Sequence, residues 1–336
     1  LTAWNLDLTW RPWALLERRV AVLSAHAQRI DWSRRPVSTA SGTRHPRIPD
    51  IDVHELTADT VNLSAGLAGT AARLNLHASA HLRSLEDMPL AIAATRLDGE
   101  GTYSLQLAFD RARMDGAFRL REPDHGPLAG LLGVPAIGLV QVSGDLAGLR
   151  QAEHVNLHLS VGGLQAHASG VVDLVHESAD LEYAADAGAM APRPDLSWQQ
   201  LHAHGTWRGT LATAEAAGEL RALGRVLPEA VRIATLQATL AAHAGNLSAR
   251  GQIAGLTAPG IPPGLLAVAP LTVDGGIRFD VASRPFNLNI THPAFTVRAK
   301  GEAAGTPEVD ADVVVGNVAA LLQGIAVHLS GPLRLH

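Results

Sequence analysis

The sequence predicts an all-β protein, built as an extended antiparallel sheet that curls around its apolar face. Apolar and polar residues alternate with period two over most of the chain. Turn signals such as Asp98-Gly99, Asp115-Gly116 and Ser143-Gly144 recur about every eight to twelve residues, a spacing typical of short strands joined by hairpins. Helical patterns are few and short, the clearest being "WALLERR" from Trp13.

The composition narrows the class of protein. With 336 residues, 47% of them hydrophobic, the chain can bury a substantial core. The net charge of −5 argues against nucleic acid as a partner, and the absence of cysteine excludes disulfides and thiolate chemistry. The longest apolar stretch, 127–140, is broken by Gly and Pro and is shorter than the roughly 20 residues that a spanning helix needs. Because the chain starts in mid-pattern at Leu1, we expect it to be an excerpt of a longer protein.

One hairpin, "VNLHLSVGGLQAHASG", shows the design most clearly. If Gly162-Gly163 is a two-residue turn, Val161 lies opposite Leu164 and the apolar residues of both strands share one face. His158, Ser160, Gln165 and His167 share the other face. The residues predicted to line the lumen are therefore Val155, Leu157, Leu159, Val161, Leu164, Ala166 and Ala168.

Other segments repeat this alternation. Tyr103, Leu105, Leu107 and Phe109 fall on one side of their strand, and a similar pattern follows in 236–253. The segment 277–297 predicts a second patch of the lining, made of Ile277, Phe279, Val281, Leu288 and Ile290.

Two stretches predict connections: 33–50, rich in Pro, Ser and Arg, and 187–197. A looser repeat places a leucine pair, a strand and a turn in succession at Leu131-Leu132, Leu265-Leu266 and Leu321-Leu322. Each copy predicts a short helical turn followed by a hairpin. Units that cannot bury their own apolar face stack into an extended array, so we expect a single continuous segment over 1–336.

No pattern of catalytic residues emerges. His54-Glu55 and His176-Glu177 begin like a zinc-protease motif, but Ala58 and Asp180 stand where its second histidine would be. His202 and His204 share one strand face as two metal ligands would, although two solvent-facing side chains are the simpler interpretation. Nucleophile elbows, Walker loops and dinucleotide fingerprints are absent. We therefore expect no enzyme activity, no catalytic or metal site and no cofactor.

The apolar face of such a sheet needs a cover. A second sheet, amphipathic helices or bound lipid would each serve, and helices are too few. The interior is then filled either by side chains or by acyl chains, and the sequence leaves both open.

Three segments resemble the TamB family, the translocation and assembly module subunits. "LDLTWRPWALLERRVAVLSAHAQRIDW" (6–32) resembles the Trp-Arg-Pro-x-x-Leu-Leu segment of the N-terminal part of these proteins. The segments 120–150 and 170–198 are similar to later parts of alphaproteobacterial TamB-like proteins.

The resemblance implies a taco-like β-groove with an apolar lumen, as in the AsmA-like, bridge-type lipid transfer proteins. It implies a periplasmic location, with the full-length protein anchored in the bacterial inner membrane. The implied partners are phospholipid acyl chains and an outer-membrane BamA-like barrel of the TamA type, which a C-terminal region absent here would contact. The implied role is to shield or conduct phospholipid between the two membranes and to support outer-membrane protein assembly. The alternative is a purely structural periplasmic bridge or adhesin-like β-solenoid with a dry core.

Overall fold

The computed structural model describes residues 2–33, 50–68, 70–82, 88–110, 112–123, 126–127, 138–193, 195–210, 213–227, 231–259, 266, 269–304, 308–316 and 333–335. The protein is nearly all β, with 77% strand and 4% helix. Its strands pair mostly in the antiparallel sense. The predicted fold class, an all-β protein with a curled antiparallel sheet and few helical turns, is confirmed.

The chain divides into two compact units. Unit 1 comprises Leu1–Gly162 and Val171–Val175, and unit 2 comprises Gly163–Gly170 and His176–His336. Each unit is an alternating sheet of the kind that the sequence predicts. A single continuous groove over 1–336 stays a prediction.

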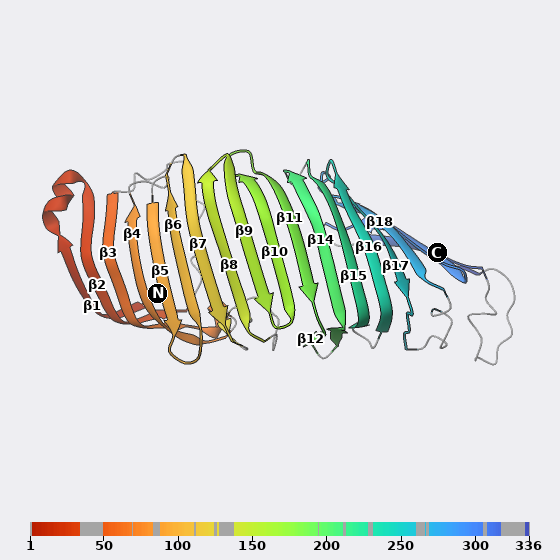
Figure 1. The fold of residues 1–336 in the computed structure, drawn as a ribbon, viewed down its shortest axis with the longest axis horizontal. Helices are drawn as coiled ribbons and strands as arrows, with labels where there is room; N and C mark the ends of the chain where they lie inside the picture. Colours follow the sequence, from red (N-terminus) through yellow and green to blue (C-terminus); the bar gives the residue numbers. More distant parts are fainter. Residues whose placement is uncertain are drawn as a thin grey trace. The chain divides into compact units, whose positions relative to one another are not determined.

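Unit 1 is a meander in which each strand pairs with the next (Figure 1). Its elements are β1 (Thr2–Arg11), η1 (Pro12–Glu17), β2 (Arg19–Trp32), β3 (Asp50–Leu63), α1 (Ala65–Ala68), β4 (Ala72–Leu82), β5 (Met88–Arg96), β6 (Thr102–Phe109), β7 (Arg113–Glu122), β8 (Val140–Leu149) and β9 (Ala152–Val161). The short helix η1 lies where the sequence predicts a helical turn near Trp13, whereas α1 was not predicted.

One pair in unit 1 is parallel: β2 with β3. Parallel neighbours need a long connection, because both strands begin at the same end of the sheet and the chain must travel back to that end. The strand β2 ends at Trp32 and β3 begins at Asp50, which agrees with the connection predicted at 33–50. Residues 34–49 of that connection lie outside the described residues.

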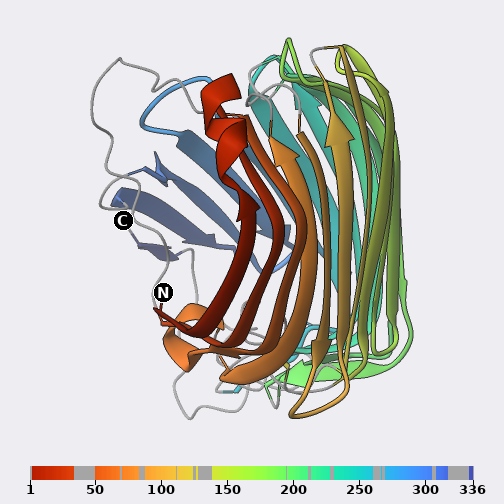
Figure 2. The ribbon, with the colours of Figure 1, turned by 90° about the vertical axis from the view of Figure 1, so that its left-hand side faces the viewer.

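The strands at the start of unit 1 bend along their length, as Figure 2 shows for β1, β2 and β3. The register shifts between Thr9 and Trp10 in β1, and twice in β3, between Val53 and Leu56 and between Ala58 and Val61. Such bulges bend a strand and increase its twist. The curl of this sheet therefore has a local cause in its backbone.

Unit 2 is antiparallel in all its described pairs, and β11 pairs with β14 across a small excursion of the chain. Its elements are β10 (Leu164–Asp173, to Gly170 in this unit), β11 (Ser178–Ala187), β12 (Met190–Arg193), β13 (Leu196–Trp198), β14 (Gln200–Gly209), β15 (Glu215–Leu227), β16 (Val231–His243), β17 (Asn246–Ala254), β18 (Leu271–Arg278), β19 (Pro285–His292), β20 (Phe295–Glu302), β21 (Glu308–Val315) and β22 (Leu333–Leu335).

The predicted connection 187–197 is more ordered than expected. It contains β12 and most of β13, which pair with each other in a small hairpin. Of the leucine pairs, Leu131-Leu132, Leu265 and Leu321-Leu322 lie outside the described residues, and Leu266 is buried. No helix in the described part of the chain is long and apolar enough to cross a bilayer.

Candidate functional site

Strand register gives unit 1 one continuous apolar face. Partner residues in neighbouring strands point to the same side of a sheet, so a chain of partners forms a row across it. Three rows cross from β1 to β9 without a charged side chain; we call them together the unit 1 apolar face. They are Trp10, Val22, Val53, Ala80, Leu90, Leu107, Gly116, Leu146, Val155; Leu8, Ala25, Leu56, Ala78, Ile92, Leu105, Phe118, Gly144, Leu157; and Leu6, Ala27, Ala58, Leu76, Ala94, Tyr103, Leu120, Val142, Leu159.

Unit 2 has the same arrangement. Three rows cross from β11 to β21 without a charged side chain, and together they form the unit 2 apolar face. They are Ala185, Ala203, Leu220, Ala238, Gly251, Val273, Ile290, Val297, Val313; Tyr183, Gly205, Gly218, Leu240, Ala249, Gly275, Leu288, Ala299, Ala311; and Leu181, Trp207, Ala216, Ala242, Leu247, Ile277, Phe286, Gly301, Val309.

The opposite face of each sheet is polar and carries cross-strand ion pairs. In unit 1 a guanidinium nitrogen of Arg119 lies 4.0 Å from an Asp145 carboxylate oxygen. In unit 2 the corresponding distance is 2.7 Å between Arg250 and Asp274. In each unit the charged side chains of the central strands thus lie on the face opposite the apolar rows.

Alanine burial shows toward which side the unit 1 sheet bends. Ala58 and Ala94 on the apolar face are buried. Ala93, Ala108 and Ala147, which have the same side chain, are exposed on the polar face. Side chains converge on the concave side of a bent sheet and spread on the convex side. The apolar face is therefore the concave one.

No second layer covers these faces in the described part of the chain. Apart from η1 against β2, each pair of elements in substantial contact consists of neighbours in the sheet. Large side chains in the middle row of each face remain accessible: Leu157 is 38% exposed and Leu240 is 37% exposed. The described residues therefore form two apolar surfaces without a packed cover, and the unit 1 apolar face is concave.

Charged groups of unit 1 enter this side of the sheet at its two margins. At one margin Tyr103 donates a hydrogen bond to the buried carboxylate of Glu122, and Arg96 lies 3.9 Å from the same carboxylate. Burial, and then the hydrogen bond to Glu122, raises the pKa of Tyr103.

At the other margin Glu153, the partner of Gly148, is fully buried. Neither of its carboxylate oxygens has a hydrogen-bond partner among the described residues. Burial, reinforced by the nearby charge of Asp115, raises the pKa of Glu153.

The predicted lining of the first patch falls on both units. Val155, Leu157 and Leu159 lie in the three central rows of unit 1, and Val161 lies at the margin opposite Val140. Gly162 and Gly163 form the predicted turn. Leu164, Ala166 and Ala168 belong to unit 2 and are less exposed than Gln165 and His167 between them, as expected for one inward face. The register across the turn stays a prediction.

The second patch needs a correction. Ile277, Leu288 and Ile290 lie in the rows of unit 2 as expected. Phe279 and Val281 were predicted on a strand, but β18 ends at Arg278 and both lie in the connection to β19.

The physical reason for this correction is the register. Ile277 with Phe286 is the last pair that joins β18 to β19, so the chain beyond Arg278 forms the connection between these two strands. The Arg278 guanidinium also holds Asp280, two residues later, with hydrogen bonds of 3.0 and 2.7 Å. Phe279 consequently lies at the edge of the sheet and is 48% exposed.

The histidines considered as metal ligands lie on the polar face or in turns. Among the described residues no group of His, Cys, Asp and Glu could hold a metal ion. His202 pairs with Asp186, and its ring lies 5.3 Å from that of His204. His176-Glu177 lies in the turn between β10 and β11.

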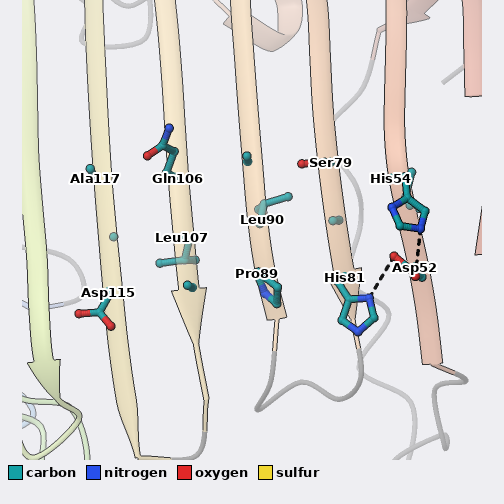
Figure 3. A pocket seen from close by; sticks show the side chains of 15 residues that line it. Asp52, His54, Ser79, His81, Pro89, Leu90, Gln106, Leu107, Asp115 and Ala117 are labelled. Atoms are coloured by element: carbon teal, nitrogen blue, oxygen red, sulfur yellow. Dashed lines mark ion pairs between the residues drawn. The ribbon is translucent and has the colours of Figure 1, made fainter. Parts of the chain in front are cut away.

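A hollow of about 850 Å³ lies over the polar side chains of β3 to β7 (Figure 3). Figure 3 shows His54 and His81 directed at the two oxygens of Asp52, at distances of 3.5 and 3.0 Å. The hydrogen bond from His81 lowers the pKa of Asp52. The carboxylate is thus already engaged by both rings, as in a surface ion-pair network.

Sequence reasoning missed Trp207 and Tyr183 on the unit 2 apolar face and the cluster of Arg96, Tyr103 and Glu122. The alternation around Trp207 was available as a signal, but the identity of its neighbours required the pairing of β11 with β14 across the intervening hairpin. No family model, no curated protein and no solved structure matches this chain.

Proposed function

We propose that the apolar faces of both units bind phospholipid acyl chains, and that this chain is a segment of a groove that shields or conducts lipid. The observation that carries the proposal is the uncovered, charge-free set of rows from β1 to β9. Monomeric soluble proteins rarely leave so large an apolar surface without a partner.

The dimensions suit such a ligand. With neighbouring strands about 4.8 Å apart, the unit 1 apolar face extends about 38 Å across its strands. One leaflet of a bilayer contributes about 15 Å of hydrocarbon thickness, so an acyl chain fits along the rows. Each methylene group removed from water contributes about 0.8 kcal/mol.

The chemistry also suits a ligand that slides. The three rows of unit 1 offer mainly dispersion contacts, from aliphatic side chains and from the rings of Trp10, Phe118 and Tyr103. Such contacts have no preferred position along the chain of a lipid. Charged groups are confined to the margins, where a headgroup would lie. This role requires no catalytic residue, and we propose none.

The setting follows from the sequence resemblance. We propose a periplasmic segment of a protein anchored in the inner membrane, acting in outer-membrane biogenesis with a BamA-like barrel in the outer membrane. The segment would contribute the path for the acyl chains, and other regions would contact the barrel.

The proposal is tested by native mass spectrometry and lipid extraction of the chain purified from bacteria. Co-purified phospholipid is expected, and Leu159→Asp should remove most of it, because a charge in an apolar groove is costly to desolvate. The matched control is Ser160→Asp, one residue further on the polar face, which should retain its lipid. A well-folded parent chain without lipid would contradict the proposal and favour a dry scaffold.

A further inference from the structure

The most exposed large apolar side chains do not lie on the apolar faces. They are Trp13 and Leu16 of η1, which are 79% and 81% exposed, whereas no other exposed large apolar side chain described exceeds 56%. The apolar rows explain the exposure of the residues that line them. They do not explain these two, which project from the end of the sheet.

The geometry of η1 makes Trp13 and Leu16 a single ridge. This helix is of the 3₁₀ type, in which side chains three residues apart eclipse each other. Between them Ala14 is buried. Pro12 begins the helix, and Arg18 ends it in the left-handed conformation, its N–H donating to the Leu15 carbonyl at 3.0 Å. The backbone therefore holds the ridge outward.

Basic residues flank this ridge. Arg19 pairs with Glu17 at 3.4 Å, but Arg11 and Arg18 have no ion pair within the described part of the chain. Figure 2 shows η1 as the red coil at the ends of β1 and β2, beyond the sheet. A projecting apolar turn with tryptophan and arginine is typical of protein segments that bind at a membrane interface. In such segments the tryptophan ring lies at the level of the headgroups and the arginines contact lipid phosphates.

We propose that η1 inserts into the interfacial region of a lipid bilayer, with Trp13 and Leu16 as the apolar ridge and with Arg11 and Arg18 contacting anionic headgroups. This contact would bring the β1 end of the unit 1 apolar face to a membrane. It goes beyond the proposed function and does not depend on lipid occupying the groove.

A protein partner fits this surface less well. An aromatic side chain offers about 150–250 Å², so the ridge presents a few hundred Å² at most. A stable protein interface buries about 800 Å² on each partner. A bilayer needs no such area, because an interfacial helix requires only an apolar side that reaches about 5–10 Å into the boundary of headgroups and acyl chains.

The test is flotation of the 336-residue chain with vesicles of phosphatidylethanolamine and phosphatidylglycerol in a ratio of about 3:1. Phosphatidylglycerol supplies the anionic headgroups that the two arginines would contact. The double variant Trp13→Ser, Leu16→Ser should bind at least about tenfold more weakly. The matched control is Leu97→Ser, Val175→Ser, which removes two exposed apolar side chains elsewhere in unit 1. It should bind like the parent.

A second variant tests the contribution of the two arginines and leaves Trp13 and Leu16 in place. Arg11→Gln with Arg18→Asn removes the two cations, and Asn tolerates the left-handed backbone at position 18. We expect weaker binding to the anionic vesicles and unchanged binding to phosphatidylcholine vesicles.

Binding of the parent equal to that of the ridge variant, or no binding by the parent, would overturn the proposal. A parent that dimerises through the ridge and ignores vesicles would assign the surface to a second copy of the chain and would also overturn it. The lipid content of the purified chain is measured separately, so a failure here leaves the proposed groove untouched.

Discussion

The two apolar faces share one design but differ in the size of their side chains. The middle row of unit 1 contains Leu56, Ile92 and Phe118 among its large members. The middle row of unit 2 has glycine at Gly205, Gly218 and Gly275. The same alternation thus produces a well-filled surface in one unit and a thinner one in the other. The central rows of both faces lack charged side chains, whereas the volume of their side chains differs.

The thinner face nevertheless holds large aromatic groups. A Cβ at Gly205 would collide with the Ala217 carbonyl oxygen and would lie 2.5 Å from the Tyr183 hydroxyl. Glycine there makes room for the tyrosine ring on the next strand. In unit 1 Gly144 does the same for Phe118. Glycine on these faces is therefore a packing choice that neighbouring strands impose.

The largest effect that bears on this comparison concerns lipid content. If both faces bind acyl chains, Leu240→Asp in unit 2 should remove lipid as Leu159→Asp does in unit 1, because each places a charge in a central row. Quantitative extraction of phospholipid from each purified variant measures this. Thr239→Asp, on the polar face of the same strand, is the control. Lipid loss from one unit alone would show that the two faces differ in function as well as in volume.

The next largest effect is on stability. Gly205→Ala should destabilise the fold by about 2–3 kcal/mol, because a backbone carbonyl must move. Gly144→Ala should cost less than about 1 kcal/mol, because the obstacles are the Phe118 ring and Leu157, side chains that can turn toward the open face. Urea unfolding followed by circular dichroism measures both. Equal costs would mean that the unit 1 face is more tightly held than its exposure indicates.

A smaller effect distinguishes the margins of the two faces. Unit 1 buries Glu153, whereas unit 2 buries His292, whose Nδ1 accepts a hydrogen bond from the Ala294 N–H at 3.2 Å. Glu153→Gln should stabilise the protein by about 1 kcal/mol at neutral pH, because it removes an unpartnered buried carboxylate.

This gain depends on pH. Because the pKa of Glu153 is raised in the folded state, the folded protein holds this proton more tightly than the unfolded chain does. The free energy of unfolding therefore falls as the pH rises above the ordinary pKa of a glutamate side chain. Thermal unfolding between pH 4 and 8 should therefore show the gain of the Gln variant at neutral pH and its disappearance near pH 4. A gain that does not change with pH would contradict the raised pKa of Glu153.

The smallest effect is expected on the polar faces. Arg250 and Asp274 are both largely exposed, and exposed ion pairs contribute little. Asp274→Asn should change the free energy of unfolding by no more than about 0.5 kcal/mol. Chemical denaturation at low and high salt checks this, and a larger change would assign the pair a structural role.

Much of the fold was predictable because period-two alternation is a local property. Tyr103, Leu105 and Leu107 share a face in the structure as they do in the sequence pattern. The position of Gly162-Gly163 as a turn was equally readable, because glycine tolerates the positive φ of 56° that Gly162 adopts.

The rest depended on partners distant in sequence. The parallel pairing of β2 with β3 and the bulges of β3 could not be read from alternation. Phe279 and Val281 continued an alternating pattern, but the register of β18 with β19 ended the strand before them. The margin cluster of Arg96, Tyr103 and Glu122 brings together three strands, and each residue alone resembled an ordinary strand end.

The central claim is that one face of each sheet contacts acyl chains. Its most direct test is site-specific photo-crosslinking with benzoylphenylalanine placed singly at positions 155 to 161 of β9, in cells that contain the native membranes. The account predicts lipid adducts with a period of two, at Leu157 and Leu159 but not at Asn156, His158 or Ser160. Adducts without alternation, or none at Leu157 and Leu159, would contradict it.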